Sequence, residues 1–354
     1  MEKLLVINPG STSTKIAYFE GNERIWQEDI SHSRAELERF DDVLDQLEMR
    51  CALVKDAMAA HGVRAEDLTA LAARGGTIAP LRSGAYEVND AMVDVILHRP
   101  QDRHASLLGA LIARRIAGGA GLKAYIYDAV TVDELDDICH ITGLPFIRRV
   151  GQGHQLNMRA AALKYCADSG MDYAQSTLLV AHLGGGITVS LHIDGRVADM
   201  SNDEDGPFAP ERAGCLPATP FMDLCFGGEY SKKDVVRLLK GKGGLVAWLG
   251  TGDTREVERR IAQGDEKARL IYDAMALGVA KALAKLTPLC RGKVDRIILT
   301  GGIAHSEMFT EMIRSRVDWI APVTVIPGEN EMQALADGVL RVLRGEETAR
   351  LMEK

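Results

Sequence analysis

Two stretches of the sequence combine a flexible backbone with hydrogen-bond donors in a way that suits the oxygens of a phosphate. In the first, Gly10 precedes a run of small hydroxyl residues and one lysine: Ser11, Thr12, Ser13, Thr14 and Lys15. Hydroxyl and backbone N–H groups beside a compact cation can bind phosphate oxygens. In the second, His182 precedes Gly184, Gly185 and Gly186. An ordinary hairpin turn explains either stretch alone, but the presence of two copies favours a pair of phosphate-binding loops.

Two arginines lie where they could project into a cleft. Arg74 precedes a Gly-Gly pair, and Arg212 lies in the stretch 206–217, where three prolines exclude regular structure. Either one could equally be a solvated surface arginine, and Arg82 is an alternative to Arg74. Because the arginine fork binds carboxylate or phosphoryl oxygens through two parallel hydrogen bonds, both residues are candidates for holding anions.

A carboxylate and an imidazole complete the candidates in the first half of the chain. Asp128 interrupts the apolar run 124–132, which predicts a strand. A carboxylate in such a run is costly unless it has a partner or a metal ion. His104 begins an apolar helix predicted over 105–113. Although such a histidine is more often structural, a helix N-terminus and an imidazole together favour a nearby anion.

The elements that must position these residues occur twice. Residues 4–19 and 178–193 both have the pattern of a buried strand, a loop and a second strand, and each then turns back into a third strand. This repetition predicts a duplicated α/β domain that faces its own copy across a cleft, with the two loops holding one polyphosphate between them.

The remaining pattern predicts helices and strands around these repeats. Helical spacing predicts one amphipathic helix over 35–61, a helix over 90–98 capped by Asn89, and a long core helix over 266–289. The stretch 250–256, which contains Asp253 and Arg255, caps another helix. A strand over 294–303 ends in Gly301, Gly302 and Ile303, where the backbone could approach a nucleotide. A strand over 323–327 precedes a last helix through about residue 343, which we expect to pack on the first domain.

Composition narrows the class of protein. The chain has 354 residues, enough for about two domains, and a net charge of -8 with no basic run, which argues against nucleic-acid or anionic-membrane surfaces. Glu2 and Lys3 lead directly into a strand, so we expect no signal peptide, and no apolar stretch reaches the ~18 residues of a membrane span. The six cysteines show no metal or disulfide spacing, which predicts reduced thiols and a cytoplasmic protein.

Seven stretches, taken in order, resemble one known family. They are residues 7–15, 73–76, 104–106, 182–187, 206–214, 299–303 and 327–332, and they span nearly the whole chain. The sequence resembles the acetate kinase family, and within it the butyrate kinases, which belong to the actin, sugar kinase and Hsp70 superfamily. The resemblance implies two actin-like, ribonuclease H-like domains around a nucleotide cleft. We expect domain boundaries of 1–149 with about 332–354, and 150–331.

The resemblance also implies an activity and roles for residues. The activity is reversible phosphoryl transfer from ATP, with Mg²⁺, to butyrate or a similar short-chain carboxylate, in a homo-oligomer. Arg74 and Arg212 match the arginines that hold the reacting anions, and His104 and His182 match phosphate-contacting histidines. Asp128 and Glu331 match the acidic pair near the metal, with Glu329 as an equal alternative to Glu331. The phosphate loop and adenosine side match Asn8, Ser11, Ser13, Lys15, Gly184, Gly185, Gly186, Asp253, Arg255, Gly301, Gly302 and Ile303.

Three departures from the family pattern leave the acid substrate open. Leu107 replaces an asparagine, the segment 150–157 is one residue longer than expected and contains His154, and Cys215 replaces a small residue. Acetate, propionate or a branched acid are therefore alternative substrates. A regulatory ATP-binding protein that keeps the fold without the transfer reaction is the alternative from another class.

Overall fold

The computed structural model describes residues 1–353 and divides into two compact units. Unit 1 comprises Met1–Asp133 and Asn330–Lys354, and unit 2 comprises Glu134–Glu329. Within the described residues, no helix combines the length and the hydropathy needed to cross a membrane.

The sheet of unit 1 has the strand order β12-β5-β6-β4-β1-β2-β3. Strands β1, β2 and β3 form an antiparallel meander, while β4 pairs parallel to β1 and β6 pairs parallel to β4. The strands are β1 (Lys3–Pro9), β2 (Ser13–Glu20), β3 (Glu23–Ser31), β4 (Ala70–Arg74), β5 (Ala85–Glu87), β6 (Ala124–Tyr127) and β12 (Arg350–Leu351).

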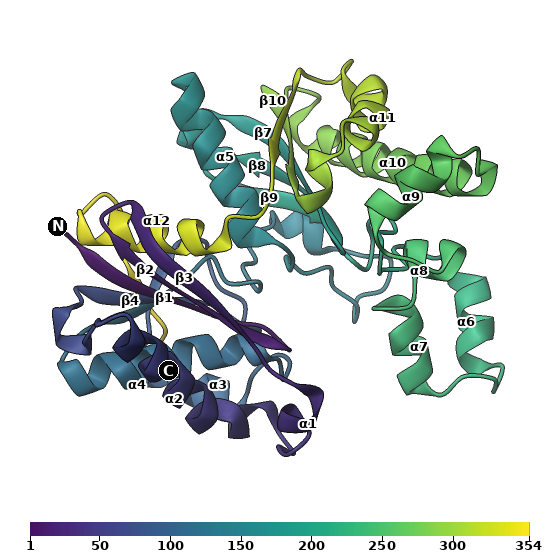
Figure 1. The fold of residues 1–354 in the computed structure, drawn as a ribbon. Coiled ribbons are helices and arrows are strands. Elements are labelled where there is room, and N and C mark those ends of the chain that lie inside the picture. Colours follow the sequence, from purple (N-terminus) through teal and green to yellow (C-terminus); the bar gives the residue numbers. More distant parts are fainter. Residues whose placement is uncertain (354) are drawn as a thin grey trace. The chain divides into compact units, whose positions relative to one another are not determined.

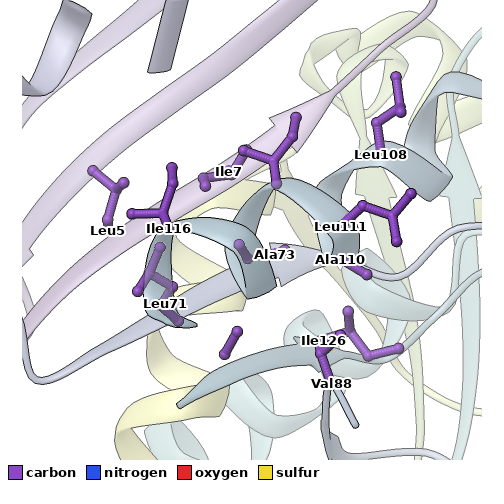
Figure 2. Close-up of a cluster of buried hydrophobic side chains, with 14 of the residues drawn as sticks. Leu5, Ile7, Leu71, Ala73, Val88, Leu108, Ala110, Leu111, Ile116 and Ile126 are labelled. Carbon is purple, nitrogen blue, oxygen red and sulfur yellow. The ribbon is translucent and has the colours of Figure 1, made fainter. Parts of the chain in front are cut away.

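Helices cover the sheet of unit 1. Alternate strand residues such as Leu5, Ile7 and Leu71 pack against Leu108 and Leu111 of helix α4 in one buried cluster (Figure 2). The helical elements are α1 (Arg34–Leu37), η1 (Val43–Gln46), α2 (Leu47–Ala60), η2 (Ala65–Asp67), α3 (Asp90–His98), η3 (Ala105–Leu107), α4 (Leu108–Ala120) and α12 (Glu331–Leu343).

The last helix, α12, returns to unit 1 and contacts β1, β4 and β6, as the sequence predicted (Figure 1). The approach is close because Gly338 faces the ring of Tyr127. A Cβ added to Gly338 would lie 2.5 Å from that ring. Residues 330–343 therefore form part of the fold of unit 1, although almost 200 residues of unit 2 precede them in the chain.

The sheet of unit 2 has the order β11-β10-β7-β8-β9, which repeats the arrangement of meander and parallel strands seen in unit 1. This repetition confirms the predicted duplication. The strands are β7 (Thr177–Leu183), β8 (Ile187–Ile193), β9 (Arg196–Ser201), β10 (Arg296–Gly301) and β11 (Val323–Pro327).

Two buried clusters lie on the faces of this second sheet. Leu178, Val180 and Ile298 pack with α5, while Leu179 and Leu299 pack with α10 and α11 (Figure 1). The helical elements are η4 (Asp137–His140), α5 (Gln155–Ser169), η5 (Tyr173–Gln175), α6 (Ala218–Phe226), α7 (Lys232–Leu239), α8 (Gly244–Leu249), α9 (Thr254–Ala262), α10 (Glu266–Leu286), η6 (Thr287–Cys290), η7 (Gly302–His305) and α11 (Glu307–Val317).

Two predicted elements of unit 1 were wrong. The single helix over 35–61 is instead α1, η1 and α2, because Asp42 and Asp45 form a capping box that starts a new helical segment. The strand over 124–132 ends at Tyr127, because Asp128 adopts the left-handed conformation with φ 41° and turns the chain out of the sheet.

The division between the units falls at Asp133, ahead of the position near residue 150 that the sequence suggested. Side-chain and backbone hydrogen bonds explain the difference. Arg149 donates to Asp199 and Asp205 at 3.0 and 2.9 Å, and the Asp136 N–H donates to the Ala198 carbonyl at 2.9 Å. Residues 134–149 are therefore held by strand β9 and the loop after it.

Candidate active site

Three candidate residues of unit 1 lie at one edge of its sheet. Asn8 lies near the carboxyl end of β1, Arg74 ends β4 and Asp128 follows the end of β6. These strands are parallel neighbours, with Ile7 opposite Ala73 and Arg74 opposite Tyr127. Ligands of open α/β sheets bind outside the carboxyl ends of the strands. The topology therefore gathers these side chains where a ligand would bind.

Glu331 joins this group from the first turn of α12. Its Oε2 accepts a hydrogen bond from the Asn8 amide at 2.8 Å, and its Oε1 pairs with the Arg74 guanidinium. Arg74 is thus held beside Asn8, whereas the competing Arg82 lies exposed in the loop that follows. We refer to Asn8, Ser11, Arg74, His104 and Glu331 as the unit 1 cluster.

His104 connects the first loop to this group. Its Nε2 lies 3.2 Å from Ser11 Oγ, and its Nδ1 accepts from the Ser106 N–H at 3.2 Å. Because Nδ1 is an acceptor there, the neutral ring carries its proton on Nε2, which faces the loop. Desolvation and the positive charge of Arg74 lower the pKa of His104. The ring is thus a neutral N–H donor at pH 7.

Ser13 and Lys15 lie in strand β2 rather than in the turn itself. Lys15 is the cross-strand partner of Asn8, so the two side chains leave the same face of the sheet. The structure thereby brings Lys15 to the face on which Asn8 contacts Glu331, as a phosphate site would require.

Asp128 is buried, with 4% exposure, and its Oδ1 accepts the Gly84 N–H at 2.6 Å. Its left-handed backbone and this hydrogen bond fix the carboxylate next to the end of β4. Among residues 1–353, no three His, Cys, Asp or Glu side chains gather as a metal site. Mg²⁺ usually takes one or two carboxylates together with substrate phosphates and water. The oxygens of Asn8, Asp128 and Glu331 fit that mode of binding.

His182 is the centre of the candidate site in unit 2. Its ring is 2% exposed and stacks on the His154 ring, with 3.9 Å between centroids and 10° between planes. The Asn157 amide donates to His182 Nδ1 at 2.8 Å, and Glu329 Oε1 lies 3.2 Å from Nε2. An amide N–H only donates and a carboxylate only accepts. These two partners therefore fix the neutral tautomer of His182, with the proton on Nε2.

Asn157→Asp is expected to lower kcat about 10- to 100-fold, the range found when the hydrogen-bond partner of a metal-ligating histidine is lost. A carboxylate at this position would require the proton on Nδ1, which removes the Nε2 donor from the neutral ring. The kcat values of the variant and the wild type, measured at one pH, check this, with Asn22→Asp, at an exposed turn, as the control. An unchanged kcat would contradict the tautomer assignment.

The glycine loop and the proline-rich stretch meet in unit 2. The Glu211 N–H donates to the Gly185 carbonyl at 3.1 Å. A Cβ added to Gly186 would lie 3.4 Å from His154 Cε1 and 3.8 Å from Arg212 Cγ. Arg212 also donates to Asp203 at 3.3 Å and is partly exposed. We refer to His154, His182, Gly184–Gly186, Arg212 and Glu329 as the unit 2 cluster.

A separate cavity of about 460 Å³ collects residues predicted for the adenosine side. It is lined by Thr254, Arg255, Glu258, Gly302, Ile303, His305 and Ser306. Asp253 caps α9 and forms a two-point ion pair with Arg255 at the start of that helix. Gly301 has φ 92° and passes so close to Leu183 that a Cβ would lie 2.5 Å from its carbonyl oxygen. The glycine turn thus lets β10 approach β7 beside the cavity.

Comparison with known proteins shows the family of the chain. The chain is 42% identical to probable butyrate kinase 2 of Caldanaerobacter subterraneus subsp. tengcongensis over 352 residues, which covers 99% of each chain. The family model described as the acetokinase family matches residues 157–320. The chain belongs to the acetokinase family.

Solved structures show the same fold for this acetokinase-family chain. The acetate kinase of Porphyromonas gingivalis has a TM-score of 0.80 at 18% identity, covering 97% of this chain and 100% of that one. A propionate kinase from Francisella tularensis has a TM-score of 0.78 at 19% identity, covering 96% and 99%. The predicted family and fold class are therefore confirmed.

Several residues of the candidate site in this acetokinase-family chain were missed or left open by the sequence pattern. No sequence pattern indicated Asn157, because its role depends on a hydrogen bond to His182 in strand β7, 25 residues later in the chain. His154 was noted only as a departure, and its stacking on His182 depends on tertiary structure. Glu329 and Glu331 are not alternatives in the structure: Glu329 contacts His182 in unit 2, and Glu331 contacts Arg74 in unit 1.

Proposed function

We propose that the chain is a carboxylate kinase that transfers a phosphoryl group reversibly from ATP to butyrate or a similar short-chain acid, giving an acyl phosphate and ADP. The observation that carries this proposal is the 42% identity to a probable butyrate kinase over 99% of both chains. The residues gathered in the unit 1 cluster and the unit 2 cluster support it, because they supply guanidinium, imidazole and amide donors for anions.

The acceptor of this reaction requires no general base. A short carboxylic acid has a pKa near that of a glutamic acid side chain, about 4.3, so it is already ionised at neutral pH. What the reaction requires is the neutralisation of repulsion between an anionic acceptor and an anionic phosphate. We therefore assign no proton-abstracting role to Asp128.

Two guanidinium groups are candidates for this purpose. We propose that Arg74 and Arg212 hold the carboxylate and the transferring phosphoryl group, since an arginine cannot lose its proton and presents a planar fork. Neutral His104 and His182 then donate from Nε2 to phosphoryl oxygens. The turn at Ser11, with Ser13 and Lys15, and the glycines 184–186 bind the phosphates.

The remaining candidates complete the nucleotide side. We propose that the adenosine occupies the cavity lined by Arg255, Gly302 and Ile303, with Asp253 orienting Arg255 and Gly301 shaping the turn. Asn8, Asp128 and Glu331 would hold Mg²⁺, which when bound supplies positive charge at the phosphate oxygens. The predicted homo-oligomer stays a prediction.

Acyl selectivity is the first test. A methylene in an apolar pocket changes the free energy of the transition state by about 1–3 kcal/mol, which corresponds to roughly 10- to 200-fold in kcat/KM. We expect kcat/KM for butyrate to exceed that for acetate by at least ~10-fold. Rates with acetate, propionate, butyrate, isobutyrate and valerate, measured with ATP and Mg²⁺, check this. A maximum at acetate or propionate would establish the corresponding kinase instead, and one at isobutyrate a kinase for branched acids.

Trapping of the product separates an enzyme from a binding protein. Hydroxylamine converts an acyl phosphate into a stable hydroxamate, so the kinase should yield butyryl hydroxamate in proportion to the ADP formed. Binding of ATP without hydroxamate from any of the five acids would favour the regulatory ATP-binding protein.

A further inference from the structure

Arg50 lies beneath the first loop with no accessible surface. Its side chain leaves helix α2 and is 0% exposed, which makes it one of the largest fully buried side chains among the described residues. The guanidinium meets the turn between β1 and β2, which is 36 to 40 residues away in the sequence. An arginine is rarely buried this completely without a charged partner.

The guanidinium is saturated by neutral acceptors. Nη1 donates to the carbonyls of Gly10 and Ser13 at 3.0 and 2.9 Å and to Thr14 Oγ1 at 2.9 Å. Nη2 donates to the Ser11 carbonyl at 3.4 Å and, like Nε, to Gln46 Oε1. Within residues 1–353, no carboxylate forms an ion pair with Arg50. Burial lowers the pKa of Arg50 to about 10, so the side chain still carries its charge at pH 7.

These contacts also set the direction of the turn's N–H groups. A trans peptide is planar, so its N–H points opposite to its C=O. Because Arg50 draws the Gly10 and Ser11 carbonyls inward, the N–H groups of Ser11 and Thr12 point outward. Both residues are exposed, and no hydrogen bond of the described chain uses either N–H. Successive outward N–H groups form a concave binding site for an anion.

We infer that Arg50 is a positioning residue for phosphate: its guanidinium holds the Gly10–Thr14 turn with two backbone N–H groups outward and supplies a buried positive charge that an external phosphoryl group neutralises. The inference rests on the proposed function, because the phosphoryl group is that of ATP or of the acyl phosphate. It accounts for a buried cation with no ion-paired carboxylate among the described residues, since the bound anion takes that role.

Arg50→Met, which removes the charge and keeps much of the volume, tests the inference. We expect the Kd for ATP and for inorganic phosphate to rise at least 10-fold, while the Kd for adenosine, which has no phosphate, stays at the wild-type value. Arg50→Lys should recover part of the loss, because an ammonium keeps the charge but cannot span the same carbonyls. Arg39→Met, at an exposed site in the same unit, is the matched control. Wild-type Kd values for ATP and phosphate in a folded Arg50→Met variant would overturn the inference.

A measurement on the wild-type protein covers the case in which Arg50→Met does not fold. Backbone amide signals of Ser11 and Thr12 should shift on titration with inorganic phosphate, and the absence of any shift at saturating phosphate would overturn the inference. Failure of the proposed function is distinguishable. If no acid gives a hydroxamate but Arg50→Met loses phosphate binding, the anion site is supported and the kinase activity is contradicted. If hydroxamate forms and Arg50→Met binds phosphate like the wild type, the kinase activity is supported and the role of Arg50 is contradicted.

Discussion

Arg212→Ala is expected to lower kcat for acyl phosphate formation by ~10²-fold or more, the cost of removing a group that stabilises charge in a transition state. The Cγ of Arg212 lies near Gly186, and the guanidinium donates to Asp203, so its loss removes positive charge from the unit 2 cluster. Binding of ATP should persist, because the cavity at Arg255 and Gly302 is formed by other residues. Turnover by hydroxamate trapping and ATP affinity by calorimetry together check this.

The exposed Arg269→Ala, also in unit 2, is the matched control for the loss of one positive charge. Its kcat should equal that of the wild type. If Arg212→Ala keeps near-normal turnover, Arg212 has no part in the transfer and the carboxylate must be held by other groups.

Unfolding free energy is expected to fall by about 1.4 kcal/mol for each pH unit as the pH drops below about 6.5. The cause is His192 in strand β8, which has no accessible surface and lies between Tyr173 Oη and Ser190 Oγ, each at 2.8 Å. Complete burial, aided by the charge of Arg159, lowers the pKa of His192 to about 3.

The sign follows from proton binding. Between about pH 3 and 6.5 the unfolded chain protonates this histidine and the folded chain does not, so the contribution of His192 to stability is complete above the unfolded pKa of about 6.5 and is lost as the pH falls toward 3. Urea unfolding between pH 4 and pH 7 measures it. His192→Gln should flatten the dependence, whereas His98→Gln, at an exposed helix end, should leave it unchanged. Equal slopes for His192→Gln and the wild type would assign the acid sensitivity to other groups.

Local sequence patterns were sufficient for much of the fold. The runs around residues 4–19 and 178–193 predicted β1, β2, β7 and β8, because their alternation and turns are set by neighbours in sequence. Asn89 was predicted as a helix cap, and the stretch 250–256 was predicted to contain one, which is Asp253 in the structure; a cap acts within three residues. Strand β11 has the predicted bounds, and helix α12 ends at residue 343 as predicted.

Features that depend on distant contacts were not predictable from the sequence. Arg50 has the sequence context of any helical arginine, and only the approach of α2 to the first loop gives it partners. The predicted helix over 35–61 breaks because Asp42 caps a new helical segment in place of continuing the first one. The spacing of apolar residues, on which the prediction was based, does not detect such a cap. The early end of β6 follows from the left-handed backbone of Asp128, a conformation that a carboxylate residue adopts only in a suitable tertiary setting.

The return of α12 to the first unit has a consequence for synthesis on the ribosome. Unit 2 is one continuous segment, and all its strands and helices are translated before α12. Unit 1 lacks the helix that packs on Tyr127 until the end of translation. Domains usually acquire their structure in the order of their emergence, N-terminal first. In this protein the order is reversed, and the first part to be translated is the last to be completed.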